Sequence, residues 1–98
     1  MNYKIILKEE ADNELSELDH NQKILVFKQL KKLSTSPELG VKLGNKAGFD
    51  LSGCRKIYVD KKKIRIVYKI VEDEIIVEII AIGKRDEMEV YKKASQRL

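Results

Sequence analysis

Three apolar runs separated by short polar breaks fill residues 55–82, and this pattern constrains the fold more than any other feature of the chain. The runs are rich in β-branched residues and cover residues 55–59, 63–71 and 75–82. The breaks, at residues 60–62 and 72–74, have the length of hairpin loops. The pattern therefore predicts three consecutive antiparallel strands. The third run is apolar on both of its faces, which is typical of a strand covered on two sides.

The first half of the chain predicts one strand followed by two helices. Residues 2–8 read as a strand, and Ala11, Leu15 and Leu18 then recur at helical spacing. Residues 19–21 break this helix and offer N-cap side chains to a second helix over residues 22–33. Glycines and a preceding proline predict a loop over residues 38–53. Residues 86–97 predict a final helix.

The predicted order is β-α-α-β-β-β-α, and the 98 residues are expected to form one domain, residues 1–98. Helices grouped before a strand meander are typical of an α+β fold. We expect the N-terminal helical hairpin to pack on one face of a mainly antiparallel four-stranded sheet. The opposite face of that sheet is then expected to stay partly open.

Positive charge is concentrated in the second half of the chain. Residues 1–52 carry 8 lysines and 8 acidic residues, whereas residues 53–98 carry 12 lysines and arginines against 8 acidic residues. The difference, 12 minus 8, equals the whole formal net charge of +4. All four arginines lie there, and a guanidinium presents a planar fork of donors that matches phosphate. The bias indicates an anionic partner, although a solvated surface with chance clustering explains it equally well.

Several familiar site types are missing from the sequence. The single histidine, His20, lies in the turn between the predicted helices, and the single cysteine, Cys54, is expected to be a packing residue. There is no metal-ligand cluster, glycine-rich phosphate loop or Ser-His-Asp set, so we expect no metal and no cofactor. The lone cysteine, the lack of an apolar run of about 20 residues and the lack of a signal-peptide pattern make the cytoplasm the expected location.

Cationic and phenolic residues remain as candidates for chemistry. Lys56 and Tyr58 are two apart on one predicted strand and therefore share a face, while Arg65 lies on the neighbouring strand. Arg85 follows the third strand, and Tyr91 lies on the final helix. These groups are expected to converge on the open face. Taken singly, each is better explained as an ordinary exposed polar residue.

Four segments of the second half resemble the RelE-type ribosome-dependent mRNA interferases. The segments are Cys54-Arg55-Lys56-Ile57-Tyr58, Ile64-Arg65-Ile66-Val67-Tyr68, Ile82-Gly83-Lys84-Arg85 and Glu89-Val90-Tyr91. In that family a strand lysine, an Arg-x-Val-Tyr strand, a Gly-Lys-Arg corner and a Val-Tyr on the last helix recur in this order. Residues 1–52 resemble the family only in the order strand, helix, helix.

The resemblance implies a toxin of a type II toxin–antitoxin system that enters the ribosomal A site and cleaves mRNA there without a metal. The 2′-hydroxyl of the RNA attacks the adjacent phosphate and leaves a 2′,3′-cyclic phosphate. By position, Lys56, Arg65 and Arg85 are expected to stabilise that phosphate. Tyr91 is expected to stack on a base or to orient the nucleophile. The additional RNA contacts are expected to be Arg55, Lys63 and Lys84.

Tyr58 departs from the family pattern, in which a second lysine is the proposed base. Free tyrosine and free lysine both titrate at about pH 10, so either needs a lowered pKa to act as a base near neutrality. Neighbouring cations favour the phenolate and lower the pKa of a tyrosine. Tyr58 is therefore expected to replace the lysine as base, or only to position RNA while the rate is lower. Lys84 is a substitute with less support.

The same resemblance implies partners. A RelB-like antitoxin is expected to wrap the toxin as an extended, partly helical segment, on the basic face and along the grooves that flank the helix pair. The ribosome, at its 30S A site, and mRNA are the expected targets. Operator DNA is reached only through the antitoxin complex, and no membrane partner is expected.

Three other functions stay open. ParE-like members of the same superfamily share the fold but inhibit DNA gyrase and lack the ribonuclease residues, so the joint presence of Lys56, Arg65, Arg85 and Tyr91 argues against that function. A non-catalytic RNA- or protein-binding module is compatible with the basic half of the chain. An inactive, regulatory family member is the third alternative, because the base position is altered.

Overall fold

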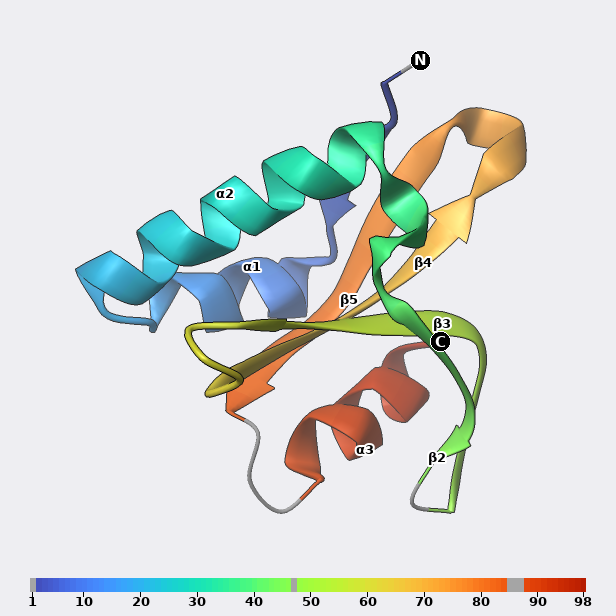
Figure 1. Cartoon of the computed structure of the whole chain (residues 1–98). Helices are drawn as coiled ribbons and strands as arrows, with labels where there is room; N and C mark the ends of the chain where they lie inside the picture. The colour runs from blue at the N-terminus through green and yellow to red at the C-terminus, as the bar shows by residue number, and fades with distance from the viewer. Residues whose placement is uncertain (1, 47, 85–87) are drawn as a thin grey trace.

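The computed structural model describes residues 2–46, 48–84 and 88–98, and a five-stranded sheet runs through it with helices on both faces (Figure 1). The strands are β1 (Lys4–Leu7), β2 (Val41–Lys46), β3 (Phe49–Val59), β4 (Ile64–Val71) and β5 (Ile76–Lys84). The helices are α1 (Glu9–Ser16), α2 (His20–Thr35) and α3 (Glu89–Arg97), with short 3₁₀ helices at Pro37–Leu39 and Glu72–Glu74. None of the described helices is long and apolar enough to cross a membrane. The predicted α+β class is confirmed.

The strand order across the sheet is β1-β5-β4-β3-β2. β1 pairs in parallel with β5, and the other three pairs are antiparallel. The two polar breaks of the sequence therefore join β3 to β4 and β4 to β5, as their length predicts. The sheet is mainly antiparallel as predicted, but it has five strands and not four.

The loop predicted for residues 38–53 is wrong. Within it, residues 41–46 form β2, and β3 begins at Phe49 and not at Arg55. β2 lies at the edge of the sheet, and its Leu43 packs against the core beneath α3 while Val41 is exposed, so its apolar pattern is too short to mark a strand. Its register shifts between Lys42 and Gly44, and Gly44 adopts a left-handed φ of 69° that suits glycine. The glycines that signal a loop in the sequence instead accommodate a bulged edge strand.

The α1–α2 pair covers one face of the sheet, as predicted (Figure 1). The helix residues buried in this first core are Ala11, Leu15, Val26, Leu30 and Leu33. The strand residues that they meet are Val59, Ile64, Ile66, Tyr68, Val77, Ile79 and Ile82. Every second residue of β4, from Ile64 to Ile70, therefore faces the helix pair, as strand geometry requires.

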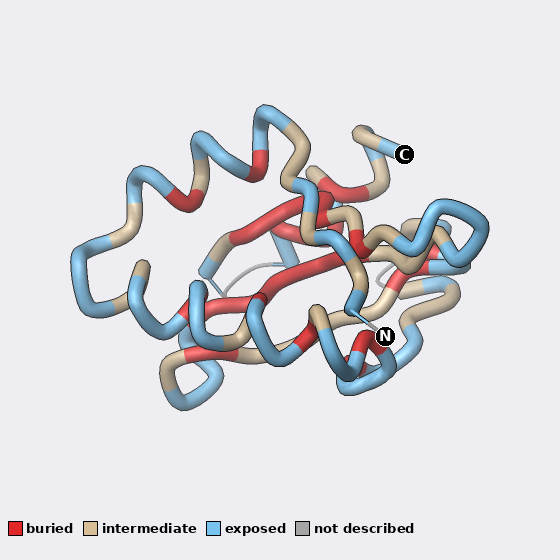
Figure 2. The backbone as a smooth tube through the Cα atoms, turned by 90° about the horizontal axis from the view of Figure 1, so that it is seen from above, coloured by how far each residue is buried: buried red, intermediate tan, exposed pale blue. Residues whose placement is uncertain are grey.

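The opposite face, which the sequence predicts to be partly open, carries a second core beneath α3. The residues of this core are Leu51, Cys54, Val67, Ile80, Ala81, Val90, Tyr91 and Ala94. Ile80 and Ala81 both face α3 because the pairing of β4 with β5 shifts by one residue after Val67. In Figure 2 the buried stretches lie along the central strands and on the inward turns of the helices. The predicted coverage of β5 on two sides is thus confirmed, and Cys54 packs as expected.

A charged contact ties α1 to the end of α3. The guanidinium of Arg97 donates from Nη1 and Nη2 to the two carboxylate oxygens of Glu14, at 2.8 and 3.0 Å. Glu14 Oε1 also accepts from the Ile82 amide at 3.1 Å, beyond the point where β1 stops pairing with β5. Arg97 Nη1 donates to the Ile80 carbonyl at 3.0 Å as well. This contact, which we call the Glu14–Arg97 clamp, fixes the C-terminal end of α3 over the second core.

Candidate active site

The pairing of β3 with β4 places three of the predicted site residues side by side. Tyr58 lies directly opposite Arg65 in the register, and Lys56 precedes Tyr58 by two residues on the same face of β3. This is the face that α3 covers, since Ile57 and Val59 pack toward the α1–α2 core. The spacing of the residues in the sequence is therefore enough to bring them together once the hairpin closes.

Lys56 and Tyr58 form a hydrogen-bonded pair. Lys56 Nζ donates to the Tyr58 hydroxyl at 2.9 Å and lies 4.9 Å from the centre of its ring. This hydrogen bond chiefly, with a smaller contribution from Arg65, lowers the pKa of Tyr58 to about 8, against the opposing effect of desolvation. The same hydrogen bond raises the pKa of Lys56. Near neutral pH the pair is thus an ammonium donating to a phenol that ionises readily.

Arg65 lies between two aromatic rings. Its guanidinium carbon is 5.5 Å from the centre of the Tyr58 ring and 4.3 Å from that of Tyr91, so both rings hold the cation. The residue is 4% exposed, and its Nη1 contacts the Met88 sulfur at 3.9 Å. The buried Nε has no hydrogen-bond partner among the described residues. A bound ligand with an acceptor atom could supply the hydrogen bond that this buried donor lacks.

Tyr91 reaches the site from α3, and its ring is fully buried. Its hydroxyl finds no hydrogen-bond partner of good geometry in the described part of the chain, although Lys56 is near enough to act on it electrostatically. In this arrangement the ring packs against the Arg65 guanidinium, and its burial leaves no surface on which a nucleic-acid base could stack. Base stacking, one of the two roles expected for Tyr91, is therefore not available while α3 holds this position.

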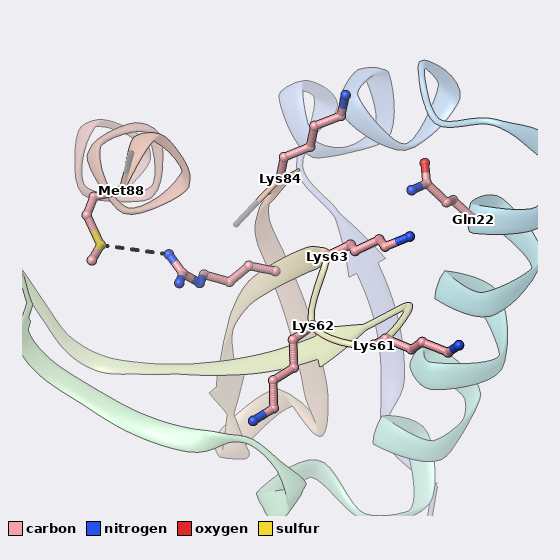
Figure 3. A pocket seen from close by; sticks show the side chains of 7 residues that line it. Gln22, Lys61, Lys62, Lys63, Lys84 and Met88 are labelled. Atoms are coloured by element: carbon pink, nitrogen blue, oxygen red, sulfur yellow. Dashed lines mark hydrogen bonds between the residues drawn. The ribbon is translucent and has the colours of Figure 1, made fainter. Parts of the chain in front are cut away.

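A pocket of about 680 Å³ lies beside the active-site group and shares Arg65 with it (Figure 3). The residues that line it are Gln22, Lys61, Lys62, Lys63, Arg65, Lys84 and Met88. Lys63 and Lys84 are two of the expected RNA contacts. Lys61, Lys62 and Gln22 were missed, because a run of lysines in a hairpin turn reads as a solvated break and Gln22 reads as an ordinary residue of a helix start. The run of three consecutive lysines was the sequence feature that could have indicated an anion-binding pocket.

One expected residue, Arg55, does not join this group. Arg55 lies on the α1–α2 side of β3, where its Nη1 donates to the carbonyl of Gly40 at 2.8 Å and to that of Glu38 at 3.3 Å. It thereby holds the connection between α2 and β2, on the face opposite to Lys56. Arg85 lies outside the described residues.

The arrangement suits chemistry on a phosphodiester. Tyr58 can accept a proton once it is ionised, and Lys56 with Arg65 can stabilise negative charge. Arg65 is buried, whereas Lys56 and Tyr58 are half-exposed and open to a substrate. Among the described residues, no group of three or more His, Cys, Asp or Glu side chains is placed to hold a metal ion.

Comparison with known proteins shows similarity to bacterial toxins. The family model of the ParE toxin of type II toxin–antitoxin systems matches residues 5–89. A RelE-like toxin protein of Escherichia coli is 30% identical over 99 residues, which is 100% of this chain and 99% of that protein. The mRNA interferase toxin RelE of E. coli K12 is 36% identical over 45 residues, which is 46% of this chain and 47% of the relative.

Solved structures show the same similarity. A mutant of the E. coli RelE toxin in the free state has a TM-score of 0.82 and 27% identity, and the alignment covers 100% of this chain and 99% of that one. A chain of the intact E. coli RelBE toxin–antitoxin complex has a TM-score of 0.70 and 26% identity, with 87% of this chain and 99% of that one covered. Sequence and fold together place the protein: it belongs to the RelE/ParE superfamily of toxins from type II toxin–antitoxin systems.

Proposed function

We propose that this toxin is an endoribonuclease that cuts mRNA in the ribosomal A site, in the cytoplasm, and so stops translation. The observation that carries the proposal is the convergence of Lys56, Tyr58, Arg65 and Tyr91, in which two buried polar atoms have no described partner. Buried polar groups are normally hydrogen-bonded, so atoms of this kind mark the place of a ligand. The cations around them favour an anionic ligand. A phosphate group of RNA is such a ligand, and one relative is named an mRNA interferase.

The proposed reaction is a transesterification within the RNA. The 2′-oxygen forms a bond to the adjacent phosphorus while the bond from phosphorus to the 5′-oxygen of the next nucleotide breaks. Tyr58, as phenolate, takes the proton of the 2′-hydroxyl, and Lys56 with Arg65 stabilises the extra negative charge on the phosphate. Arg85 is assigned to stabilising the negative charge on the departing 5′-oxygen, which takes a proton from a water molecule and leaves as a hydroxyl. No metal or cofactor takes part in this scheme.

Tyr91 is assigned to substrate orientation through its hydroxyl. The hydroxyl is buried beside Lys56 but makes no hydrogen bond of good geometry with a described residue, so a phosphate or ribose oxygen entering the site would supply one. The ring meanwhile keeps Arg65 in place through the contact of 4.3 Å.

An antitoxin is the second proposed partner. E. coli RelE has been solved in complex with the antitoxin RelB and with a RelB peptide, at 26% and 27% identity to this chain. We infer that a RelB-like segment of acidic or amphipathic character neutralises this toxin by binding its basic face and the grooves beside the α1–α2 pair. Operator DNA is contacted only through that complex.

Inducible expression in bacteria, followed by primer extension on a translated mRNA, tests the proposed activity. The wild-type toxin is expected to arrest growth and to produce cuts within codons. Arg85→Ala is expected to abolish both effects while the circular dichroism spectrum stays native. Equal behaviour of the two proteins would remove Arg85 from the site, and growth arrest without any cut would remove the ribonuclease activity.

The ParE family match supports a second candidate function, inhibition of DNA gyrase. This function predicts that the purified toxin blocks supercoiling of a relaxed plasmid and leaves mRNA intact. The lysines and arginine around Tyr58 favour the ribonuclease, because gyrase inhibition gives no reason to lower the pKa of a phenol.

A further inference from the structure

The turn between β3 and β4 has an uncommon backbone. Asp60, Lys61 and Lys62 have φ values of 55°, 53° and 70°, so three consecutive residues with a Cβ lie in the left-handed region. Each of them is strained there, and only aspartate among the three is commonly tolerated. Backbone strain of this kind persists where the surrounding structure enforces it, and it is concentrated at functional sites.

Contacts on both sides enforce this conformation. The Lys63 amide donates to the Asp60 carbonyl at 3.0 Å and closes the turn. Gln22 Nε2 donates to Asp60 Oδ2 at 3.2 Å and ties the turn to the first turn of α2. That end of α2 is itself fixed by Asp19, whose side chain accepts from the Gln22 amide at 2.8 Å. The turn is therefore held in place at the mouth of the pocket.

The held turn gathers lysines around the pocket (Figure 3). Lys61 and Lys63 extend toward the side where Gln22 lies, and Lys84 rises from the end of β5 on the same side. Lys62 turns the other way and lies 5.9 Å from the centre of the Tyr58 ring. No described carboxylate lines the pocket or forms an ion pair with any of these four lysines. The Asp60 carboxylate lies in the turn but accepts from Gln22, and like charges that form no described ion pair repel one another, so this arrangement favours an anionic ligand.

We propose that this pocket binds the RNA phosphate next to the scissile one, with Lys61, Lys63 and Lys84 as its ligands. The inference rests on the proposed function, because it takes the scissile phosphate to lie at Lys56, Tyr58 and Arg65. Arg65 forms a wall of both places, so a strand bound at the active site continues directly into the pocket. A volume of about 680 Å³ lies within the range of sites that hold a small ligand. The left-handed backbone of the turn carries Lys61 into the lining of this pocket, next to Lys63 and Lys84.

Binding of short RNAs that cannot be cut tests this subsite. Each probe carries a 2′-deoxy sugar at the scissile position. One probe is a dinucleotide, and the other two are trinucleotides that extend it by one nucleotide, on the 5′ side in one and on the 3′ side in the other. Fluorescence anisotropy gives their affinities for three proteins: wild type, Lys61→Gln/Lys63→Gln/Lys84→Gln, and Lys28→Gln/Lys31→Gln/Lys32→Gln. The last variant removes the same charge from exposed positions of α2 outside the pocket.

One of the two extensions is expected to strengthen binding about three- to fivefold in the wild type and in the α2 variant, which is the size of one exposed ion pair. The pocket variant is expected to lose this gain. A plot of log affinity against log salt concentration for the extended RNA should also be less steep in this variant, by about 0.7 in slope, because one phosphate contact is lost. Melting temperatures of the three proteins check that the fold is unchanged.

Either of two results with RNA would overturn the subsite: an equal gain in the pocket variant, or no gain on either side in the wild type. Binding of poly-glutamate that falls in the pocket variant while the RNA gain survives would also overturn it, in favour of an acidic peptide ligand. Cleavage of A-site mRNA by the wild type, measured separately on ribosomes, decides the proposed function, so a failure of one proposal is distinguishable from a failure of the other.

Discussion

Tyr58 stands where the RelE pattern has a lysine, and the two groups need different surroundings to act as a base. Nearby cations make both lose a proton more readily, but only a phenol becomes an anion when it does so. The phenolate of Tyr58 is then stabilised by the Lys56 ammonium at 2.9 Å and by Arg65, whereas a neutral amine would gain nothing from them. The pair of Lys56 with Tyr58 is thus a self-consistent replacement for a pair of lysines.

Tyr58→Phe removes the proposed base and keeps the ring that holds Arg65. We expect the single-turnover rate of A-site mRNA cleavage on programmed ribosomes to fall by about 100-fold or more, the usual contribution of a positioned base. Tyr3→Phe, at a residue that packs against the first core and does not line the pocket, serves as the control and should cleave normally. A Tyr58→Phe protein that cleaves at the wild-type rate would show that Tyr58 only positions RNA.

The pKa of Tyr58 also predicts a pH profile. The base must be deprotonated to act, so the rate should rise by about tenfold per pH unit at low pH and level off above about pH 8. Lys56→Gln removes the hydrogen bond that chiefly lowers this pKa, so the inflection should move toward higher pH. Single-turnover rates measured across the pH range check both statements. An inflection that stays in place in Lys56→Gln would contradict the role given to the hydrogen bond.

The residues of the site differ in how well the sequence predicts them. Lys56, Tyr58 and Arg65 are predictable because strand periodicity and the hairpin register fix their relative positions. The burial of Tyr91 is not predictable, because the spacing along a helix is the same whether its ring packs inward or faces a substrate. Lys61 and Lys62 are missed for a similar reason, since only the left-handed backbone of the turn directs them to the pocket.

At the scale of elements, α3 depends on the Glu14–Arg97 clamp. Both side chains are mostly buried, with 15% and 13% of their surface exposed, and Glu14 accepts from the Ile82 amide as well. The Arg97 hydrogen bonds and charge contribute to keeping the pKa of Glu14 below its usual value, against desolvation, which is the largest single influence and raises it. Loss of Arg97 would leave a largely buried carboxylate with a single weaker ion pair.

Arg97→Ala is therefore expected to lower the free energy of unfolding by about 1–3 kcal/mol, because it leaves Glu14 and the Ile80 carbonyl without their main partner. Lys93→Ala is the matched control, since Lys93 lies 3.6 Å from Glu14 and is 44% exposed. Its removal should cost less than about 1 kcal/mol. Urea denaturation of both variants measures the difference. Equal losses in the two would show that the clamp is not a specific support of α3.

Elements were predictable where an apolar pattern defines them and missed where it does not. The α1–α2 pair and strands β4 and β5 follow from periodicity, since each has an apolar face to bury. β2 is missed because it is a short edge strand with little apolar surface, although its Leu43 packs against the second core. The sequence predicts that β5 is covered on two sides but leaves the second face partly open. Alternation alone reveals neither where α3 packs nor the one-residue register shift that turns both Ile80 and Ala81 toward it.

At the scale of the whole molecule, helices cover both faces of the sheet, and the cationic pocket lies at one end of it. α1 with α2 covers one face and α3 the other, so the pocket forms where the β3–β4 turn, the end of β5 and the first turn of α2 meet (Figures 1 and 3). The excess positive charge of residues 53–98 lies partly at this end, in Lys61, Lys62, Lys63 and Lys84. Residues 1–52 carry balanced charge, so the cationic end of the sheet is suited to bind a polyanion such as ribosome-bound mRNA.

The central claim is that Lys56, Tyr58, Arg65 and Tyr91 form a site that cleaves a phosphodiester by attack of the neighbouring 2′-hydroxyl. Mass spectrometry of the mRNA fragments released from programmed ribosomes by the purified toxin tests it most directly. The account predicts upstream fragments that end in a 2′,3′-cyclic phosphate and downstream fragments that begin with a 5′-hydroxyl, and neither with Lys56→Gln/Tyr58→Phe. Intact mRNA with the wild type, or the same fragments with both proteins, would contradict it.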